Sequence, residues 1–133
     1  MNREILFKAK RKDNGKWVEG DAIHEPIGMS IRHEKNGMSV RVPVDPDTIC
    51  QFTGLTDKNG KRIWENDIVR DKTGDIFRIY WSEQHLNYSA KCVKSTFSVF
   101  INQKWDLGTL LKSQIDVEVC GNIFDSADLL EVE

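Results

Sequence analysis

The chain has 133 residues, of which 39% are hydrophobic and 30% charged, and its formal net charge is −2. This length supports one compact domain, or a small barrel with an elaboration, and excludes two large domains. No apolar run is long enough to span a membrane, and the first residues contain no hydrophobic signal region, so we expect no membrane segment and no secretory signal.

Charge is distributed unevenly along the chain. Residues 1–16 carry six basic side chains and two acids, whereas residues 113–133 carry six acids and no Lys or Arg. Such ends are either two solvated faces or complementary surfaces that pair within one fold or between subunits. The basic end supplies the candidate contacts for a partner or for nucleic acid: Lys8, Lys10, Arg11, Lys12 and Lys16.

The first third of the sequence has the pattern of β-hairpins. Residues 5–10 alternate between the two faces of a half-buried strand, and a turn at 13–16 leads to a returning strand from Trp17. A second hairpin is expected between residues 27–33 and 38–44, joined through an Asn-Gly pair.

Prolines mark the end of this first part. Proline cannot donate to a strand ladder, so Pro43 and Pro46 together with Asp45 are expected to stop regular pairing. We therefore predict an N-terminal β unit at residues 1–50 and a second unit at residues 51–133.

The second unit also has mainly strand signals. Strands are predicted at residues 63–70, 75–81, 91–101 and 115–119, a polar loop at 82–89, a helical turn at 107–113 and a C-terminal helix at 127–131. Asn59-Gly60 predicts a type I′ turn, and residues 71–74 are expected to close a second hairpin. Short strands with regularly spaced turns indicate a mainly β fold, a barrel or a sandwich. The residues expected to shape turns are Gly54, Asn59, Gly60, Asp67, Gly74 and Gly121.

Carboxylates near the middle of the chain are the best candidates for catalysis or metal binding. Glu65 and Asp67 would share a strand face, with Asp57 nearby in the sequence. However, Asp67 is also a natural turn acid whose carboxylate bonds local amides, and we favour that interpretation. Asp57-Lys58-Asn59-Gly60 is too short before its glycine for a calcium loop.

No other catalytic constellation is present in the sequence. His24, His33 and His85 have no zinc spacing with the cysteines. The three cysteines are expected to be reduced, and Cys50 and Cys120 lie among apolar neighbours as inert thiols. We expect no enzyme, no cofactor and no metal site, with a carboxylate-metal activity as the least favoured reading.

Nucleic-acid binding is the alternative that the basic residues support. The N-terminal cluster surrounds Trp17, and Arg78, Tyr80, Lys91 and Lys94 would line one face of a barrel. Against this, the sequence pI is about 5.9, whereas proteins that bind phosphate are usually basic.

Three segments of the chain resemble the YopX family of phage and prophage proteins. They are the opening 3–9 with 16–21, the block 48–61 with 64–69, and the closing 118–124 with 129–130. Asn66 departs from the family pattern, but asparagine tolerates the left-handed backbone of that turn. The resemblance implies a β-rich protein whose C-terminal part is an SH3-like β-barrel, and self-association in the cytoplasm of a bacterial host. It implies no reaction.

These observations predict a non-enzymatic phage or prophage accessory protein. We expect a self-assembling interaction module that forms a homo-oligomer and engages a phage or host protein. The alternative is a nucleic-acid-binding accessory protein of phage replication or regulation.

Overall fold

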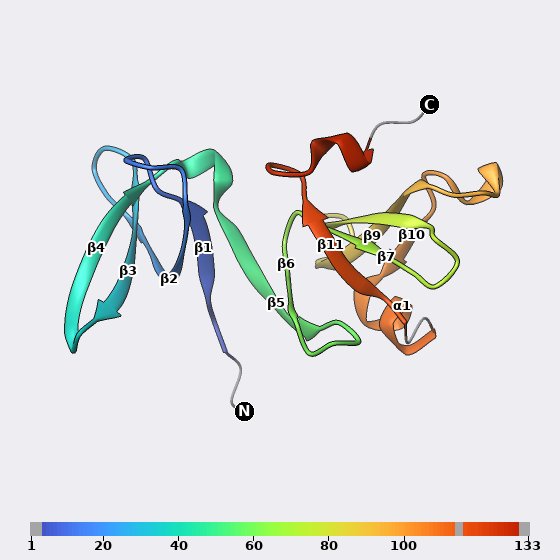
Figure 1. Cartoon of the computed structure of the whole chain (residues 1–133), viewed down its shortest axis with the longest axis horizontal. Helices are drawn as coiled ribbons and strands as arrows, with labels where there is room; N and C mark the ends of the chain where they lie inside the picture. Colours follow the sequence, from blue (N-terminus) through green and yellow to red (C-terminus); the bar gives the residue numbers. More distant parts are fainter. Residues whose placement is uncertain (1–3, 114–115, 131–133) are drawn as a thin grey trace. The chain divides into compact units, whose positions relative to one another are not determined.

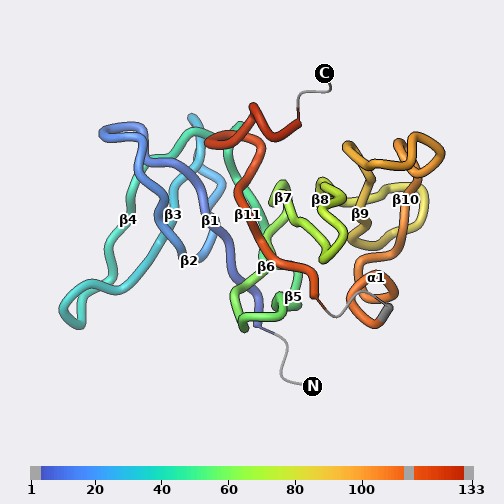
Figure 2. The backbone as a smooth tube through the Cα atoms, turned by 45° about the vertical axis from the view of Figure 1, so that its right-hand side comes forward, coloured from blue at the N-terminus to red at the C-terminus, as the bar shows by residue number. Residues whose placement is uncertain are grey.

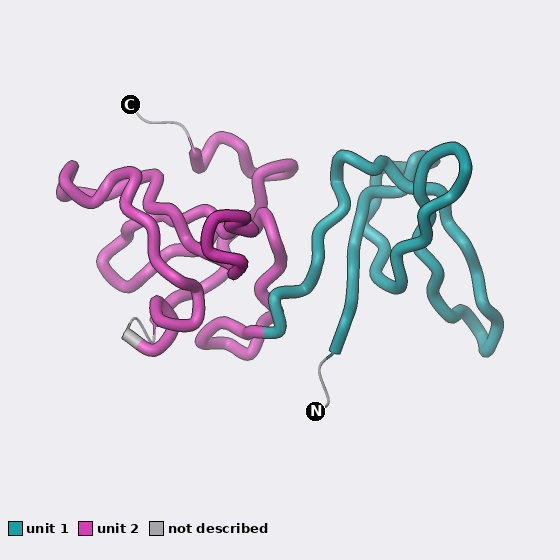
Figure 3. Tube along the Cα trace, turned by 180° about the vertical axis from the view of Figure 1, so that it is seen from behind, with its two compact units in different colours: residues 1–54 teal, residues 55–133 magenta. Residues whose placement is uncertain are grey.

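The computed structural model describes residues 4–113 and 116–130. Within these residues the fold is mainly β, with two antiparallel sheets and one short α-helix (Figure 1). The chain divides into two compact units, Met1–Gly54 and Leu55–Glu133 (Figure 3). The sequence analysis placed the boundary between residues 50 and 51. Both positions lie within one strand, β5 (Cys50–Thr56), which runs from the first unit into the second.

The first unit is a sheet of short antiparallel strands. Its strand order is β4-β3-β2-β1-β5, and β5 continues into a hairpin with β6. β2 has two partners, because residues 17–20 pair with β1 and residues 21–24 pair with β3. The elements are β1 (Phe7–Lys10), β2 (Trp17–His24), β3 (Met29–Lys35), β4 (Met38–Val44), the 3-10 helix η1 (Pro46–Thr48) and β5 (Cys50–Thr56).

A small core holds this first sheet. Ala9, Ile31 and Val44 are fully buried, and partly buried apolar side chains of β1, β2 and β3 pack against them. Pro43 lies within β4, which is an edge strand, so its missing N–H removes no ladder bond from the interior of the sheet. Regular pairing continues through Pro43, contrary to the prediction, and β4 ends at Val44, just before Asp45 and Pro46.

The second unit is a five-stranded sheet with the order β10-β9-β8-β7-β11, which can be followed in Figure 2. Its elements are β6 (Arg62–Trp64), β7 (Asp67–Arg70), β8 (Ile76–Ser82), β9 (Asn87–Lys94), the 3-10 helix η2 (Ser98–Phe100), β10 (Lys104–Asp106), α1 (Leu107–Ser113), β11 (Glu118–Asn122) and the 3-10 helix η3 (Ala127–Leu130). No helix in the described ranges is long and apolar enough to cross a membrane.

The second unit has the larger core. Side chains from β6, β7, β8, β9, α1 and the start of the last strand interdigitate there, and Trp105 packs edge-on against Phe77 with ring centroids 5.6 Å apart. The buried members are Ile63, Val69, Phe77, Ile79, Ala90, Cys92, Leu107, Leu110 and Val117. Burial of this kind provides most of the driving force for a small domain.

Several predicted elements of the second unit differ from the structure. The expected strand 63–70 is broken at Glu65-Asn66, where Asn66 has a positive φ of 72° as its turn requires. The loop 82–89 is shorter than predicted because β9 already begins at Asn87, and the last strand begins at Glu118. Residue 115, where that strand was expected to start, lies outside the described residues.

The predicted strand 91–101 ends at Lys94. The chain must reverse after it, because β10 returns to pair antiparallel with β9. The amide of Cys92 donates to the carbonyl of Gln103 at 2.9 Å, and the amide of Asn102 donates back to Cys92 at 2.7 Å. Residues 95–102 therefore form the connection, despite their alternating apolar pattern. The helical turn 107–113 is confirmed as α1, and the C-terminal helix is a 3-10 helix over 127–130.

Candidate functional site

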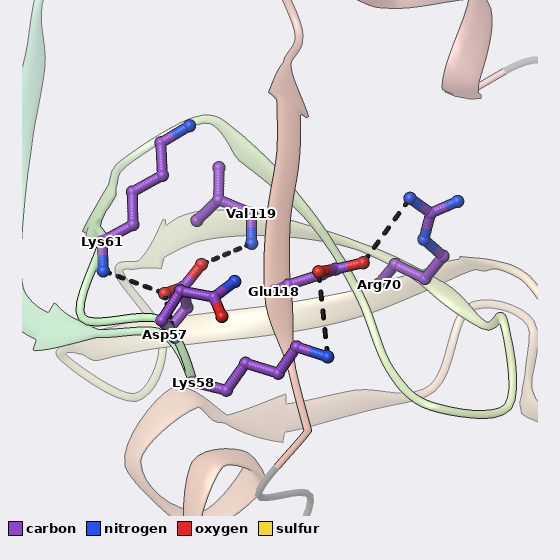
Figure 4. Close-up of polar contacts among 7 residues, drawn as sticks. Asp57, Lys58, Lys61, Arg70, Glu118 and Val119 are labelled. Carbon is purple, nitrogen blue, oxygen red and sulfur yellow. Dashed lines mark hydrogen bonds and ion pairs between the residues drawn. The ribbon is translucent and has the colours of Figure 1, made fainter.

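Asp57 is the centre of a polar cluster that joins two distant parts of the second unit. It is only 7% exposed, and one of its carboxylate oxygens accepts the amides of Asn59 and Lys61, each at 2.9 Å. The other oxygen accepts the amide of Val119, in β11, at 2.9 Å. Figure 4 shows the carboxylate between these groups. The sequence indicated the turn but gave no sign of the bond to Val119.

Three amides around one carboxylate stabilise its charged form. Burial alone would raise the pKa of Asp57, but the bonds from Val119, Lys61 and Asn59 outweigh it, and the pKa lies below its ordinary value. Asp57 is thus a structural acceptor that is ionised at neutral pH, rather than a group suited to proton transfer there.

The turn that Asp57 shapes differs from the predicted one. Among residues 57–61 only Gly60 has a positive φ, at 77°, so Asn59-Gly60 is not a type I′ turn. The Asp57 carboxylate accepts the amides of Asn59 and Lys61, and these bonds fix a turn geometry that differs from the type I′ turn. In contrast, Asn36 and Gly37 both have positive φ, and Lys35 pairs with Met38 across them. That hairpin has the type I′ geometry.

Glu118 forms a second, more exposed link beside Asp57. Its carboxylate lies 3.8 Å from the Lys58 ammonium and 3.7 Å from the Arg70 guanidinium (Figure 4). Of the six acids in residues 113–133, at least Glu118 therefore pairs with cations of the second unit. All three charged groups are partly exposed, so these ion pairs contribute little to the stability of the fold.

The other predicted turn residues have separate local roles. The Asp67 carboxylate is buried and accepts the amide of Trp64 at 2.8 Å, so Asp67 is a turn acid as favoured. Gly54 and Gly74 have positive φ values of 88° and 91°. Gly121 follows a shift of register in β11, and a Cβ there would lie 2.4 Å from the Ser126 hydroxyl.

Among the described residues no group of three His, Cys, Asp or Glu side chains is arranged to hold a metal ion. Cys50 and Cys92 are buried, and Cys120 is partly buried, and none of them forms a disulfide. Burial raises the pKa of Cys92 and of Cys120, so both thiols are less reactive than an exposed one.

Two of the five N-terminal basic residues, Lys8 and Lys10, lie over the ring of Trp17. The Lys8 and Lys10 ammonium groups lie 4.6 and 5.5 Å from the centre of the Trp17 ring. Arg11 is paired with Asp13 at 2.7 Å, and this partner raises the pKa of Arg11. The exposed side chains of Lys12 and Lys16 complete the group.

A second basic group lies on the sheet of the second unit. Arg78, Tyr80, Lys91 and Lys104 line a hollow of about 260 Å³ on β8, β9 and β10. The sequence predicted that Arg78, Tyr80 and Lys91 share a face, and this is confirmed. It included Lys94, which is not among the lining residues, and it missed Lys104, because the register of β10 against β9 is not readable from the sequence.

The connection between β9 and β10 exposes three large apolar side chains. Phe97, Val99 and Phe100 are 63%, 70% and 42% exposed, and the two phenylalanine rings meet edge to face at 5.9 Å. The loop backbone is well bonded, since the Phe100 and Ile101 amides donate within η2 and the Phe97 amide donates to Ser95 Oγ at 3.1 Å. An ordered loop thus presents a small apolar surface to solvent.

Comparison with known proteins identifies the family. A family model described as YopX protein matches residues 6–131. The chain belongs to the YopX family. The resemblance seen in the three sequence segments is therefore confirmed over nearly the whole chain.

A solved structure supports the fold of this YopX chain. The chain is similar to protein EF1440 from Enterococcus faecalis, known from a crystal structure, with a TM-score of 0.59 and 20% identity over 98% of this chain and 100% of that one. At this identity the likeness shows the fold alone. No curated protein matches the sequence.

Proposed function

We propose that this YopX chain is a non-enzymatic phage or prophage accessory protein that assembles with itself and engages a phage or host protein. The observation that carries the proposal is the apolar surface of Phe97, Val99 and Phe100 on an ordered loop. Exposed apolar groups that are held together on a rigid loop are typical of protein contact sites.

Other features support the same proposal. The carboxylates of the buried residues Asp57 and Asp67 accept hydrogen bonds from backbone amides, so neither is positioned for general acid–base chemistry. The second unit has short antiparallel strands around one core, which supports an SH3-like module. Three cysteines without a disulfide support a reducing compartment, which we propose is the cytoplasm of a bacterial host.

The experiment is a measurement of oligomeric mass over a range of protein concentrations, by light scattering after size exclusion. We expect the wild-type protein to form a homo-oligomer and the double variant F97S/F100S to shift to the monomer. The control is Ile27→Ser, because Ile27 is 94% exposed but lies in a turn of the first unit. A wild-type monomer at every concentration, or an oligomer unaffected by F97S/F100S, would overturn the assembly that we propose.

Engagement of a further protein is tested by native mass spectrometry of the tagged protein from a phage-bearing lysate. The expected result is a stoichiometric protein that stays bound after nuclease treatment and is lost from F97S/F100S but not from I27S. Added mass that disappears with nuclease would contradict a protein partner.

A further inference from the structure

Three cations stand in one row across the sheet of the second unit. Arg78 in β8 is directly opposite Lys91 in β9, and Lys91 is directly opposite Lys104 in β10. Neighbouring strands lie about 4.8 Å apart, so the row brings three positive charges within about 10 Å. Like charges that face each other across strands destabilise a sheet.

The row lies on the face of the sheet away from the core. The next row along the same strands, Ile79, Ala90 and Trp105, packs into the core, and successive residues of a strand point to opposite faces. Arg78 and Lys91 are half-buried and Lys104 is exposed. The hollow that they line with Tyr80 therefore opens on the face opposite the larger core, next to a buried part of that face, where Ile68 of β7 lies directly opposite Arg78.

Among the residues that the structure describes, no carboxylate lines this hollow. Asp106 is the nearest acid along β10, two residues beyond Lys104. Its side chain is already engaged, because one oxygen accepts from Asn87 Nδ2 at 2.9 Å and the other accepts the Thr109 amide at 3.0 Å. The described contacts therefore leave the positive charge of the row without a matching acid.

Arg78 adds an independent sign of a missing ligand. Its Nε atom is buried and has no hydrogen-bond partner within the described part of the chain. Buried polar groups are nearly always bonded, and an unpaired donor costs free energy. An anion seated in the hollow would screen the three cations, and a change of the Arg78 rotamer that turns its guanidinium toward the anion would also give this donor a partner.

We propose that the face of β8, β9 and β10 binds the phosphodiester backbone of a single-stranded nucleic acid. A row of cations that crosses three strands matches a linear series of phosphates better than a single compact anion. Tyr80 lies two residues from Arg78 on the same face and supplies a ring on which a base can stack. This site is separate from the apolar loop on which the proposed function rests.

The test measures fluorescence anisotropy of a labelled oligo-dT of about 16 nucleotides, the upper range of site sizes for small β-barrels. The double variant K91Q/K104Q is expected to bind about tenfold more weakly than the wild type. Its slope of log K against log salt is expected to fall by about 1.4 between about 50 and about 200 mM salt, because each lost phosphate contact on a single strand removes about 0.7.

Matched variants keep the test specific. K72Q removes one exposed lysine from a turn outside the row, and K8Q/K12Q removes two charges from the N-terminal group; both should leave the affinity near that of the wild type, apart from a small screening effect. Arg78→Lys keeps the charge but loses the guanidinium, and weaker binding by this variant would support a specific role for Arg78.

Several results would overturn the proposal. These are no binding of the oligonucleotide at about 50 mM salt, equal binding by K91Q/K104Q and the wild type, or loss of binding in K8Q/K12Q instead. A rise of the melting temperature with inorganic phosphate, without any oligonucleotide binding, would identify a small-anion site only and would also overturn the proposal.

The stability of the free protein gives a second readout that does not depend on the ligand. Lys91 has a cation on each side, so Lys91→Gln should raise the urea midpoint, whereas Lys72→Gln should leave it unchanged. A lower midpoint for K91Q would contradict the repulsion on which the proposal depends.

Discussion

Two loops of the second unit form the same turn, but only one of them bonds a distant strand. Asp57-Lys58-Asn59-Gly60-Lys61 and Asp71-Lys72-Thr73-Gly74-Asp75 each begin with a buried aspartate and have glycine at the fourth position. In both loops, one carboxylate oxygen accepts the amides two and four residues later, and the glycine amide donates to the aspartate carbonyl. The local geometry is therefore encoded twice by the same short pattern.

The difference lies in the second carboxylate oxygen. In Asp57 this second oxygen accepts the Val119 amide from β11. In Asp71 the additional bond is local, and the Thr73 hydroxyl donates at 2.7 Å to the same oxygen that accepts the two turn amides. One motif thus closes a hairpin, and the same motif with one more bond also attaches the last strand. The comparison shows that a turn signal identifies the local bonds of an acid but not its long-range ones.

The largest difference between the two loops is expected when each aspartate is replaced by asparagine. An asparagine oxygen can keep both turn bonds, but in Asp57→Asn an NH₂ group would face the Val119 N–H. We expect Asp57→Asn to lower the free energy of unfolding by about 2–3 kcal/mol and Asp71→Asn by less than about 1 kcal/mol. Urea denaturation of the two variants measures both values. Equal losses would mean that the bond to β11 adds nothing.

Protonation of Asp57 at low pH should destabilise the wild-type protein in the same way as the Asp57→Asn substitution. The pKa of Asp57 is lower in the folded chain than in the unfolded one, so the folded state binds fewer protons. Its contribution is therefore present above the unfolded pKa, about 3.9, and is lost as the pH falls through the folded value. Urea midpoints measured from neutral pH downward should fall less steeply below about pH 4 in D57N than in the wild type. Parallel curves would argue against this role of Asp57.

The shared part of the two loops predicts the smallest and most similar effects. Gly60 and Gly74 have φ values of 77° and 91°, a backbone region that side chains disfavour. We expect Gly60→Ala and Gly74→Ala each to cost about 1 kcal/mol, since open space surrounds both positions and only the backbone is strained. Thermal melting of both variants tests this. A large difference between them would show that the two turns are not equivalent.

The sequence predicted most strands because their alternating pattern reports one buried face. It also predicted the turn role of Asp67 and the left-handed Asn66. It failed at Asn59-Gly60, where the pair alone favours a type I′ turn but the side chain of Asp57 takes the amides first. The Asp-x-x-Gly spacing that the two loops share was the signal that could have corrected this prediction.

Tertiary context explains the remaining failures. The alternation of Phe97, Val99 and Ile101 resembles a strand, but strand propensity depends on a partner, and the chain has to turn there so that β10 can pair with β9. The alternation of side chains along each strand predicted that Arg78 and Lys91 face the same side of the sheet. Lys104 lies beside Lys91 only because of the register in which β10 pairs with β9. Periodicity can assign a residue to a face but cannot place separate strands side by side.

The bond from Val119 to Asp57 joins residues that are 62 positions apart in the sequence. During synthesis the Asp57 hairpin can close from local contacts, while its second carboxylate oxygen remains hydrated until β11 has left the ribosome. Such distant contacts raise contact order and slow the last stage of folding. The second unit therefore completes its buried polar network only after β11 has been synthesised, so the attachment of β11 is a late step in the folding of this unit.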